Sequence, residues 1–308
     1  MEAVLAGVRE FEAIGTRWRI ETSAPLDASV HREIDAVIAG FDRAWSRFRT
    51  DSTVSQLAGE GGACAAPADA AAMLDVYAEL SDATAGAVNP LVGDGLARRG
   101  YDAAYTLVDR GAAPAPERWR ELLTWADGTL RLAEPATIDV GALGKGRLVD
   151  LVAAVLDRAD AGPYVVDASG DLLVRGRGPG LERTERTERT ERTERIGLEH
   201  PFDPRRAIGV WEVQDAALCA SATTRRAWPG AGGETLHHVL DARTGEPVRT
   251  IAATWAVAAD TMTADAAATA LFFAGGERFA HERGAAWVRM TTDGRLEWSR
   301  GCTAELFS

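Results

Sequence analysis

The order of the extended and helical segments limits how this chain folds more than any other feature. Residues 16–22 alternate like a half-buried strand, and apolar residues then recur at helical spacing from Val30 to Phe48. Residues 163–176 predict a hairpin, and residues 261–275 predict an alanine-rich helix. Strands and helices do not alternate regularly, and neither G-x-G-x-x-G nor G-x-x-x-x-G-K-[ST] is present. The sequence therefore predicts an α+β fold.

Turn residues and periodicity predict the remaining elements. Further helices are expected at residues 67–86, 116–125 (short) and 146–162. Further strands are expected at residues 129–133, 137–141, 207–213, 236–242, 252–259, 285–291 and 295–299.

Length and charge restrict the class of function. The chain has 308 residues, of which 46% are hydrophobic, enough for one large domain or two ordinary ones. Its formal net charge of -12 argues against sequence-independent binding to nucleic acid, which needs a basic surface. An acidic protein of this kind binds an anionic substrate only with the help of a metal ion or local cations.

The cysteine residues and the N-terminal sequence indicate the cellular compartment in which the protein is expected. Cys64, Cys219 and Cys302 are odd in number and lack metal-type spacing, so a reducing compartment is the default. No run of about 18 apolar residues predicts a membrane span. The first residues lack the pattern of a signal peptide. We expect a cytoplasmic protein from the sequence as written, and an extracytoplasmic one if a leader once preceded it.

One segment has low complexity. The triplet Glu-Arg-Thr repeats from Glu182 to Arg195 and offers no apolar face to bury. It predicts a solvated helix or a disordered stretch, within a surface insertion at 179–199 that carries no chemistry. A protein-docking arm is the functional alternative.

Asp265 and Thr269 are the first candidate site. They lie four residues apart, so a helix places both side chains on one face. A carboxylate and a hydroxyl suit a hard cation such as Mg²⁺, which takes few protein ligands and completes its shell with substrate phosphates. The alternative is that Asp265 complements the positive end of the helix and Thr269 is incidental.

A glycine-rich turn is the second candidate. Gly141, Gly144 and Gly146 allow close approach of a ligand, and Lys145 among them can offer an ammonium group to a phosphate. Asp139 precedes them. The alternative is a flexible strand-to-helix turn with a solvated lysine.

Adjacent histidines are the third candidate. On a strand, His237 and His238 point to opposite faces, so at most one of them lines a given site. The turn that follows contains Asp241, Arg243 and Gly245. A structural role and a functional role are both compatible with this pattern.

Seven motifs in this order resemble the ApbE-type FAD:protein FMN transferases. They are "GTRWRI", "WSRFRTDSTVSQL", "TAGAVNPLVG", "DVGALGKGRLVD", "ASGDLLVRG", "HHVLDARTGEPV" and "TADAAATALFFAG". The resemblance spans about residues 13–275 and leaves out the triplet repeat. It implies one T-fold-like α+β domain over residues 1–308, with an FAD cleft between two halves.

The resemblance also implies an activity. The family uses Mg²⁺ to transfer the FMN moiety of FAD to a threonine or serine hydroxyl of an acceptor flavoprotein, with release of AMP. An FAD pyrophosphatase that yields FMN and AMP is the alternative enzyme. A non-catalytic flavin-binding protein is the alternative from another class, and an unrelated α+β protein remains if the motif order is coincidence.

Residue roles follow from the same resemblance, motif by motif. Metal ligands are implied at Asp265 and Thr269, with main-chain oxygens of Ala142 and Ala268. His238 matches the general base, which predicts slower transfer as the pH falls through the ordinary histidine range. Contacts with FAD are implied for Ile14, Phe48, Ala87, Val88, Asn89, Asp139, Lys145 and Val239.

Overall fold

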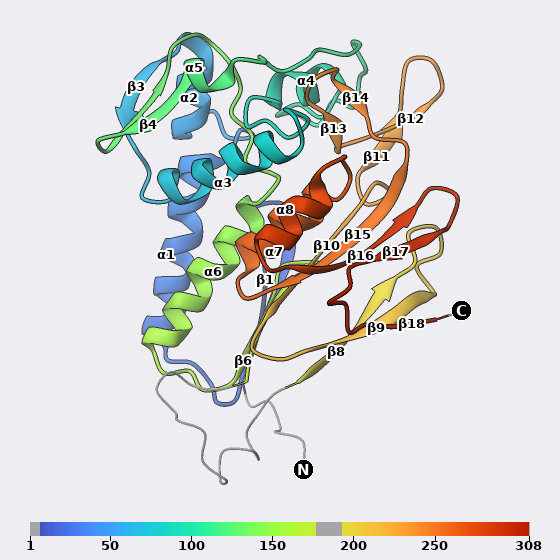
Figure 1. Cartoon of the computed structure of the whole chain (residues 1–308). Coiled ribbons are helices and arrows are strands. Elements are labelled where there is room, and N and C mark those ends of the chain that lie inside the picture. Colours follow the sequence, from blue (N-terminus) through green and yellow to red (C-terminus); the bar gives the residue numbers. More distant parts are fainter. Residues whose placement is uncertain (1–6, 177–192, 308) are drawn as a thin grey trace.

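An antiparallel sheet forms the centre of the molecule (Figure 1). The computed structural model describes residues 7–176 and 193–307. In that part of the chain the sheet has eight strands in the order β1-β2-β6-β7-β10-β15-β16-β17, and all neighbours are antiparallel. The strands are β1 (Gly7–Ala13), β2 (Thr16–Thr22), β6 (Tyr164–Asp167), β7 (Asp171–Arg175), β10 (Ala217–Ala222), β15 (Ile251–Ala258), β16 (Ala286–Thr291) and β17 (Leu296–Trp298).

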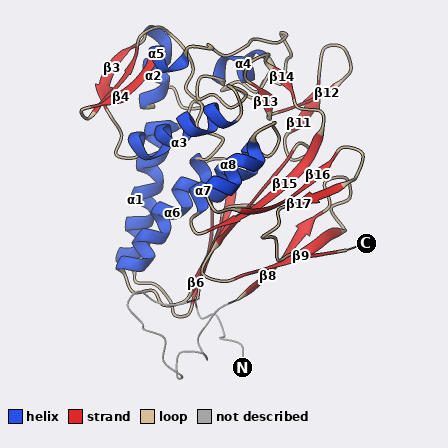
Figure 2. Ribbon diagram, viewed as in Figure 1, coloured by secondary structure: helices blue, strands red, loops and turns tan. Residues whose placement is uncertain are grey.

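Helices cover one face of this sheet (Figure 2). The longer ones are α1 (Ala28–Trp45), α3 (Ala70–Ala83), α6 (Gly144–Arg158) and α7 (Thr261–Ala270), and α8 (Gly276–Glu282) packs against α3 and α7. Shorter helices are α2 (Thr53–Glu60), α4 (Gly93–Arg98) and α5 (Trp119–Leu122). The main core lies between the helices and the sheet, where Trp18, Phe41 and Leu148 are buried together.

A second, smaller sheet covers the other face. It consists of β8 (Glu194–Glu199), β9 (Ala207–Val213) and β18 (Glu305–Leu306), in the order β18-β9-β8. Trp211 of β9 packs with Val165 of β6, whereas the neighbouring Tyr164 and Val166 belong to the helical core. Because side chains alternate along a strand, β6 supplies both cores. The central sheet is thus buried on both sides.

Smaller paired strands complete the fold. One three-stranded sheet contains β3 (Gly62–Ala65), β4 (Leu123–Ala126) and β5 (Thr129–Leu132). Two hairpins follow β10, formed by β11 (Ala227–Pro229) with β12 (Thr235–His237) and by β13 (Leu240–Asp241) with β14 (Glu246–Pro247). Trp228 and Leu236 of the first hairpin pack against Leu96 and Tyr101.

The α+β prediction is confirmed. The predicted hairpin at 163–176 is β6 and β7, and the strand predicted at 16–22 matches β2 residue for residue. The helices predicted from Val30, at 67–86 and at 146–162 appear as α1, α3 and α6. Their apolar periodicity is the signal that made them predictable.

Two predicted elements are wrong or too long. Residues 137–141 are not a strand. The Asp139 amide donates to the Pro90 carbonyl, and the Asp139 carboxylate accepts the Gly141 amide, so these groups are not available to a neighbouring strand. Of the short helix predicted at 116–125, only α5 is helical, and the chain continues directly into β4.

The strand predicted at 236–242 is broken between β12 and β13. A histidine side chain causes the break: His237 Nδ1 accepts the Val239 amide at 3.3 Å, and its Nε2 bonds the Val248 carbonyl at 2.8 Å. A side chain thus takes the place of a strand partner.

The insertion predicted at 179–199 extends too far at its C-terminal boundary, because Glu194–Glu199 form β8 and pair with β9. The rest of the Glu-Arg-Thr repeat, through residue 192, lies outside the described residues. Among the helices of the described chain, none has the length and apolar character needed to cross a membrane.

Helices α6 and α7 approach each other closely at Gly146. A Cβ atom at this position would lie 2.4 Å from the Thr261 carbonyl oxygen and 2.8 Å from Cβ of Asp265. Both neighbours belong to α7, and one of them is backbone. Only glycine fits at this contact.

We therefore expect Gly146→Ala to lower the free energy of unfolding by about 1–3 kcal/mol, as overpacking does. Gly40→Ala is the matched control, because Gly40 also lies in a helix but is exposed and has nothing within 4 Å of the added Cβ. That control should raise stability by about 0.5–1 kcal/mol. Urea denaturation measures both, and equal effects would contradict the close contact.

Candidate functional site

A cavity of about 800 Å³ lies between the helical half and the sheet. Its wall comes from the β1–β2 turn, the end of α1, the turn before α6, the β6–β7 turn, α7 and the segment that joins β12 to β13. This volume is in the range of small-molecule and cofactor sites. The lining includes most of the residues that the sequence analysis selected: Ile14, Phe48, Ala87, Val88, Asn89, Asp139, Ala142, Lys145, His238, Val239, Asp265 and Thr269.

Asp265 and Thr269 reach the cavity from successive turns of α7. Asp265 is only 4% exposed, and its Oδ2 accepts the Gly146 amide at 2.9 Å. The helix N-terminus is capped by a different residue, since Asp260 accepts the Thr263 amide. Asp265 therefore does not serve the N-terminus of its own helix: its carboxylate accepts an amide in the first turn of α6, and the residue lines the cavity.

Lys145 is not a solvated lysine. Its Nζ lies 3.2 Å from Oδ2 of Asp171 and donates to the Ser169 carbonyl at 3.4 Å. Burial lowers the pKa of Lys145, but the nearby carboxylates of Asp171 and Asp265 outweigh it and hold the pKa above its usual value. Lys145 thus stays protonated at neutral pH.

This group carries more buried negative than positive charge. Asp171 is 1% exposed, and burial raises its pKa despite the ammonium beside it. Burial, followed by repulsion from Asp171, raises the pKa of Asp265 well above its ordinary value. One ammonium therefore faces two carboxylates that lack full compensation. An added cation would supply the missing charge.

The donors present fit a hard cation with few protein ligands. Asp265, Thr269 and the main chain at Ala142 all line the same cavity. Within residues 7–176 and 193–307, no three His, Cys, Asp or Glu side chains gather into a metal-binding cluster. Mg²⁺ suits such a site because it usually keeps one or two carboxylates and takes its other oxygens from water and phosphates.

Ala268 does not belong to this group. It is fully buried within α7 and does not line the cavity. Its carbonyl accepts the hydroxyl of Thr254 on β15 at 2.7 Å. The oxygen implied as a metal ligand is thus turned toward the sheet, which the spacing on a helix could not reveal.

Hydrogen bonds fix the shape of the glycine-rich turn. The Tyr77 hydroxyl donates to the Asp139 carbonyl at 3.0 Å and accepts the Ala142 amide at 3.1 Å. Burial and the charge of Asp139 raise the pKa of Tyr77 well above its ordinary value, so it remains a donor. The side chain of Tyr77 thereby holds Ala142 at the cavity wall.

An ion pair occupies the carboxylate of Asp139. Arg47 Nε lies 2.5 Å from Asp139 Oδ2, and Arg47 Nη1 donates to the Tyr101 carbonyl at 2.8 Å. The structure therefore gives Asp139 two structural partners, Arg47 and the Gly141 amide. Its contact with FAD stays a prediction.

Aromatic side chains line another part of the cavity. Phe48, Tyr101 and Tyr105 pack on one another, with ring centroids 5.1–5.4 Å apart. The guanidinium of Arg47 lies over Phe48 at 4.2 Å, and that of Arg226 lies over Tyr101 at 5.6 Å. This part of the wall is apolar and cationic, unlike the group around Asp265.

The two histidines have different environments. His237 is buried and uses both ring nitrogens on backbone groups, so its role is structural. His238 lines the cavity beside Tyr101, at a ring separation of 6.5 Å. Only one of the two histidines thus lines the cavity, although the strand from which this was predicted is interrupted.

Burial, with the charge of Arg226 next in importance, lowers the pKa of His238 from 6.5 to about 4. The ring is therefore neutral throughout the range in which histidine ordinarily titrates. A neutral imidazole can accept a proton. The predicted loss of rate in the ordinary histidine range accordingly moves toward pH 4.

Two other predicted contact residues are held firmly by the fold. Ile14 and Gly15 form the two-residue turn between β1 and β2, with φ of 46° and 74°. A left-handed conformation is costly for a β-branched residue, and it places Ile14 at the cavity. Asn89 donates to the Pro116 carbonyl and accepts the Leu91 amide, which shapes its loop.

The sequence analysis did not select several polar or aromatic residues of the wall, among them Arg47, Tyr101, Tyr105, Asp171 and Arg226. Arg47 and Asp171 lie within the motifs quoted above, whereas Arg226 lies outside them. Their partners are distant in sequence, as for Arg47 and Asp139. Tyr101 and Tyr105 lie outside those motifs, and no local pattern marks them.

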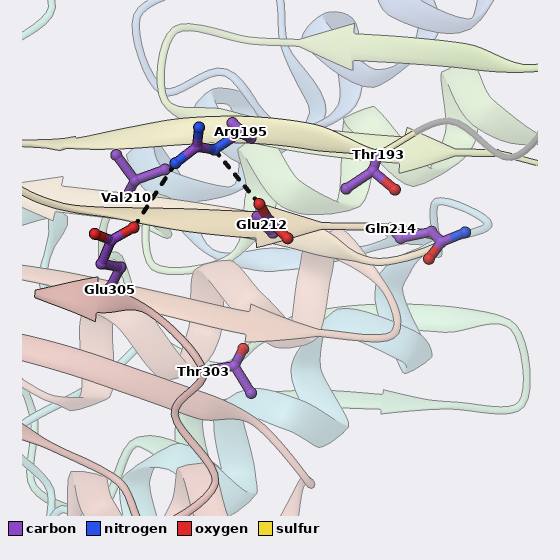
Figure 3. A pocket seen from close by; sticks show the side chains of 7 residues that line it. All are labelled: Thr193, Arg195, Val210, Glu212, Gln214, Thr303 and Glu305. Atoms are coloured by element: carbon purple, nitrogen blue, oxygen red, sulfur yellow. Dashed lines mark ion pairs between the residues drawn. The ribbon is translucent and has the colours of Figure 1, made fainter.

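A second hollow lies on the outer face of the β8-β9-β18 sheet (Figure 3). Arg195 lies 3.4 Å from Glu212 and 3.7 Å from Glu305, and all three side chains are largely exposed. Exposed ion pairs of this kind contribute little free energy. Nothing in this hollow resembles a reactive group, so the cavity above is the candidate site.

Comparisons with known proteins identify the family of the chain. A family model described as the ApbE family matches residues 14–290. A protein named FAD:protein FMN transferase from Treponema pallidum is 28% identical over 301 residues, which cover 89% of this chain and 81% of that protein. A protein of the same name from Rhodobacter capsulatus is 26% identical over 93% of this chain, which spans 55% of its length.

Solved structures share the fold. The ApbE protein from Thermotoga maritima has a TM-score of 0.79 at 21% identity, covering 95% of this chain and 96% of that one. The flavinyl transferase ApbE from Pseudomonas stutzeri, in its apo form, has a TM-score of 0.77 at 20% identity, covering 97% of each chain. At such identities the likeness establishes the fold.

The lowered pKa of His238 predicts how the stability of the protein depends on pH. The unfolded chain binds a proton on this residue below about pH 6.5, whereas the folded chain resists it until about pH 4. The free energy of unfolding should therefore fall as the pH decreases through that window. His238→Gln should flatten the fall, and His281→Gln, at an exposed position on α8, should not. Urea denaturation at pH 7, 6, 5 and 4.5 would refute this if the three proteins changed in parallel.

Proposed function

This chain belongs to the ApbE family, and we propose that it is an FAD:protein FMN transferase. In this proposal Mg²⁺ assists the transfer of FMN from FAD to a serine or threonine hydroxyl of an acceptor flavoprotein, and AMP is released. The observation that carries the proposal is the cavity, which combines an undercompensated acidic group with an aromatic wall and a neutral histidine. A dinucleotide with a flat ring and a charged diphosphate matches both parts.

Asp265, Thr269 and the Ala142 carbonyl are the residues that would hold the metal ion. When bound, Mg²⁺ would neutralise charge on the diphosphate that is cleaved. The chain contributes rigidity: Gly146 fixes the orientation of Asp265, and Tyr77 fixes Ala142. Such fixed donors need little rearrangement during the reaction.

Lys145 would supply a second positive charge to the phosphates. Asp171 and the Ser169 carbonyl hold its ammonium at the cavity wall. The protein as a whole has a formal charge of -12, so an anionic substrate depends on such local cations. Phosphoryl transfer relies mainly on this kind of positioning and charge stabilisation.

His238 would act as the general base toward the acceptor hydroxyl. Its ring is neutral at physiological pH and lies in the cavity wall. The hydroxyl proton passes to the ring nitrogen as the oxygen attacks the phosphorus, and the bond to AMP breaks. Burial, and after it the charge of Arg226, keeps the ring neutral by lowering its pKa.

An FAD pyrophosphatase is the second candidate, because the same groups could activate water. Incubation of the protein with FAD and Mg²⁺, with and without a candidate acceptor, separates the two. A transferase adds the mass of FMN to the acceptor and releases AMP with it. FMN and AMP free in solution, with an unmodified acceptor, would favour the pyrophosphatase. Bound flavin without AMP would indicate a non-catalytic flavin-binding protein.

Asp265→Ala should abolish Mg²⁺-dependent turnover, because the metal ion would lose its carboxylate on α7. Thr269→Ala should be milder, since water can replace a hydroxyl ligand. AMP release at saturating FAD measures both, and thermal unfolding checks that the variants fold. Wild-type turnover in folded Asp265→Ala would end the metal assignment.

His238→Ala should lower transfer by roughly 10²- to 10⁴-fold while FAD still binds, as expected for loss of a general base. His237→Ala should mainly lower stability, because His237 joins Val239 and Val248 through its ring. Mass spectrometry of the acceptor and urea denaturation separate the two effects. A larger loss of transfer in folded His237→Ala than in His238→Ala would reverse the assignment.

A further inference from the structure

Tyr105 occupies space that the proposed function requires for its substrate. Its ring stacks on Phe48, with centroids 5.1 Å apart and planes 15° apart. The guanidinium of Arg47 lies over the same phenyl ring at 4.2 Å. Both neighbours thus occupy stacking area on the ring against which the family resemblance places the flavin.

The Tyr105 side chain also reaches the β1–β2 turn. Its hydroxyl oxygen lies 3.8 Å from the point that a Cβ on Gly15 would occupy, next to Ile14 in the β1–β2 turn. Its edge packs against Tyr101 at a centroid separation of 5.4 Å. Tyr105 therefore lies between the two elements that carry Ile14 and Phe48, and all three residues line the cavity.

This ring can leave without disturbing a core. Tyr105 is 49% exposed, so one side already faces solvent. Its backbone is held in place: the Asp102 carboxylate accepts the amides of Ala104 and Thr106, and the Asp102 carbonyl accepts the Tyr105 amide. Rotation of one exposed side chain on a fixed turn is thus sufficient to open this part of the cavity.

Two buried polar atoms beside these rings lack partners. Arg47 Nη2 and His238 Nδ1 are both shielded from solvent, and neither has a hydrogen-bond partner among the described residues. Arg47 lies over Phe48 and Tyr101, and His238 lies beside Tyr101. Unsatisfied groups of this kind are costly and are expected where a site is closed without its ligand.

We propose that Tyr105 holds the place of the flavin ring system in the free protein and exchanges with it. The inference rests on the proposed function for the identity of the ligand. A planar ring system larger than a phenol gains more stacking area on Phe48 than Tyr105 gives up. Tyr105 then turns toward solvent or covers the outer edge of the bound ring, so it acts as a positioning residue for the flavin.

Flavin binding to variants tests the exchange without turnover. Riboflavin and FAD are titrated in EDTA, and quenching of flavin fluorescence gives Kd and the association rate. Tyr105→Ala should bind riboflavin about two- to ten-fold more tightly and associate faster, because no internal competitor remains. Tyr105→Phe keeps the ring and should behave as wild type. Val108→Ala, an exposed apolar truncation in the same loop outside the cavity lining, is the matched control.

Weaker riboflavin binding by folded Tyr105→Ala would overturn the exchange, since Tyr105 would then be a fixed wall. An unchanged Kd and association rate would overturn it as well. Both results leave the proposed function intact, because flavin still binds. Failure of every protein, wild type included, to bind either flavin would instead overturn the proposed function together with the exchange.

Fluorine NMR gives an independent readout. The chain has four tyrosines, so 3-fluorotyrosine labelling yields few resonances, and Tyr105→Phe assigns the one of interest. Riboflavin should move this resonance toward the position of a solvent-exposed tyrosine or a new stacked position, whereas Tyr164, which is buried and does not line the cavity, should not shift. An unshifted Tyr105 resonance at saturating riboflavin would overturn the exchange.

Discussion

The contact between α6 and α7 at Gly146 is the constraint on which the candidate site depends. Because this residue lacks a Cβ, α7 comes close enough for Asp265 to accept the Gly146 amide. The same approach brings Lys145, one residue earlier on α6, within the field of Asp265. A hydrogen bond between two helices thus sets the position of a buried carboxylate, and the helices themselves are fixed by the main core.

The site separates charges of opposite sign within one cavity. Asp171 and Asp265 give one part a surplus of negative charge that a cation can satisfy. Arg47 and Arg226 lie among aromatic rings in another part, where burial and then the charge of Arg226 lower the pKa of His238. A substrate that carries both phosphates and a flat ring therefore meets different chemistry at each of its ends. In a protein with such an acidic overall charge, this local arrangement matters more than net charge.

The sequence predicted the periodic elements well and the side-chain partnerships poorly. Helices α1 and α6 and the β6–β7 hairpin follow from hydrophobic periodicity alone. The strands predicted at 137–141 and 236–242 were wrong or interrupted because the side chains of Asp139 and His237 bind backbone amides. Hydrophobic periodicity carries no information about such bonds. Most of the residues selected from the motifs line the cavity, but motif order could not pair Arg47 with Asp139 or turn the Ala268 carbonyl toward Thr254. Those contacts depend on residues distant in sequence.

The pairing of β2 with β6 has a consequence for folding kinetics. Thr22 lies opposite Tyr164, so this pair closes a loop that contains α1, α3, α6 and the glycine-rich turn. Closing a long loop costs entropy before its contacts form, and domains rich in such distant pairs fold slowly. The β1–β2 hairpin and the helices can form locally, whereas the central sheet needs both ends of this loop together. We therefore expect the cavity, which draws its wall from both ends, to be completed at a late step of folding.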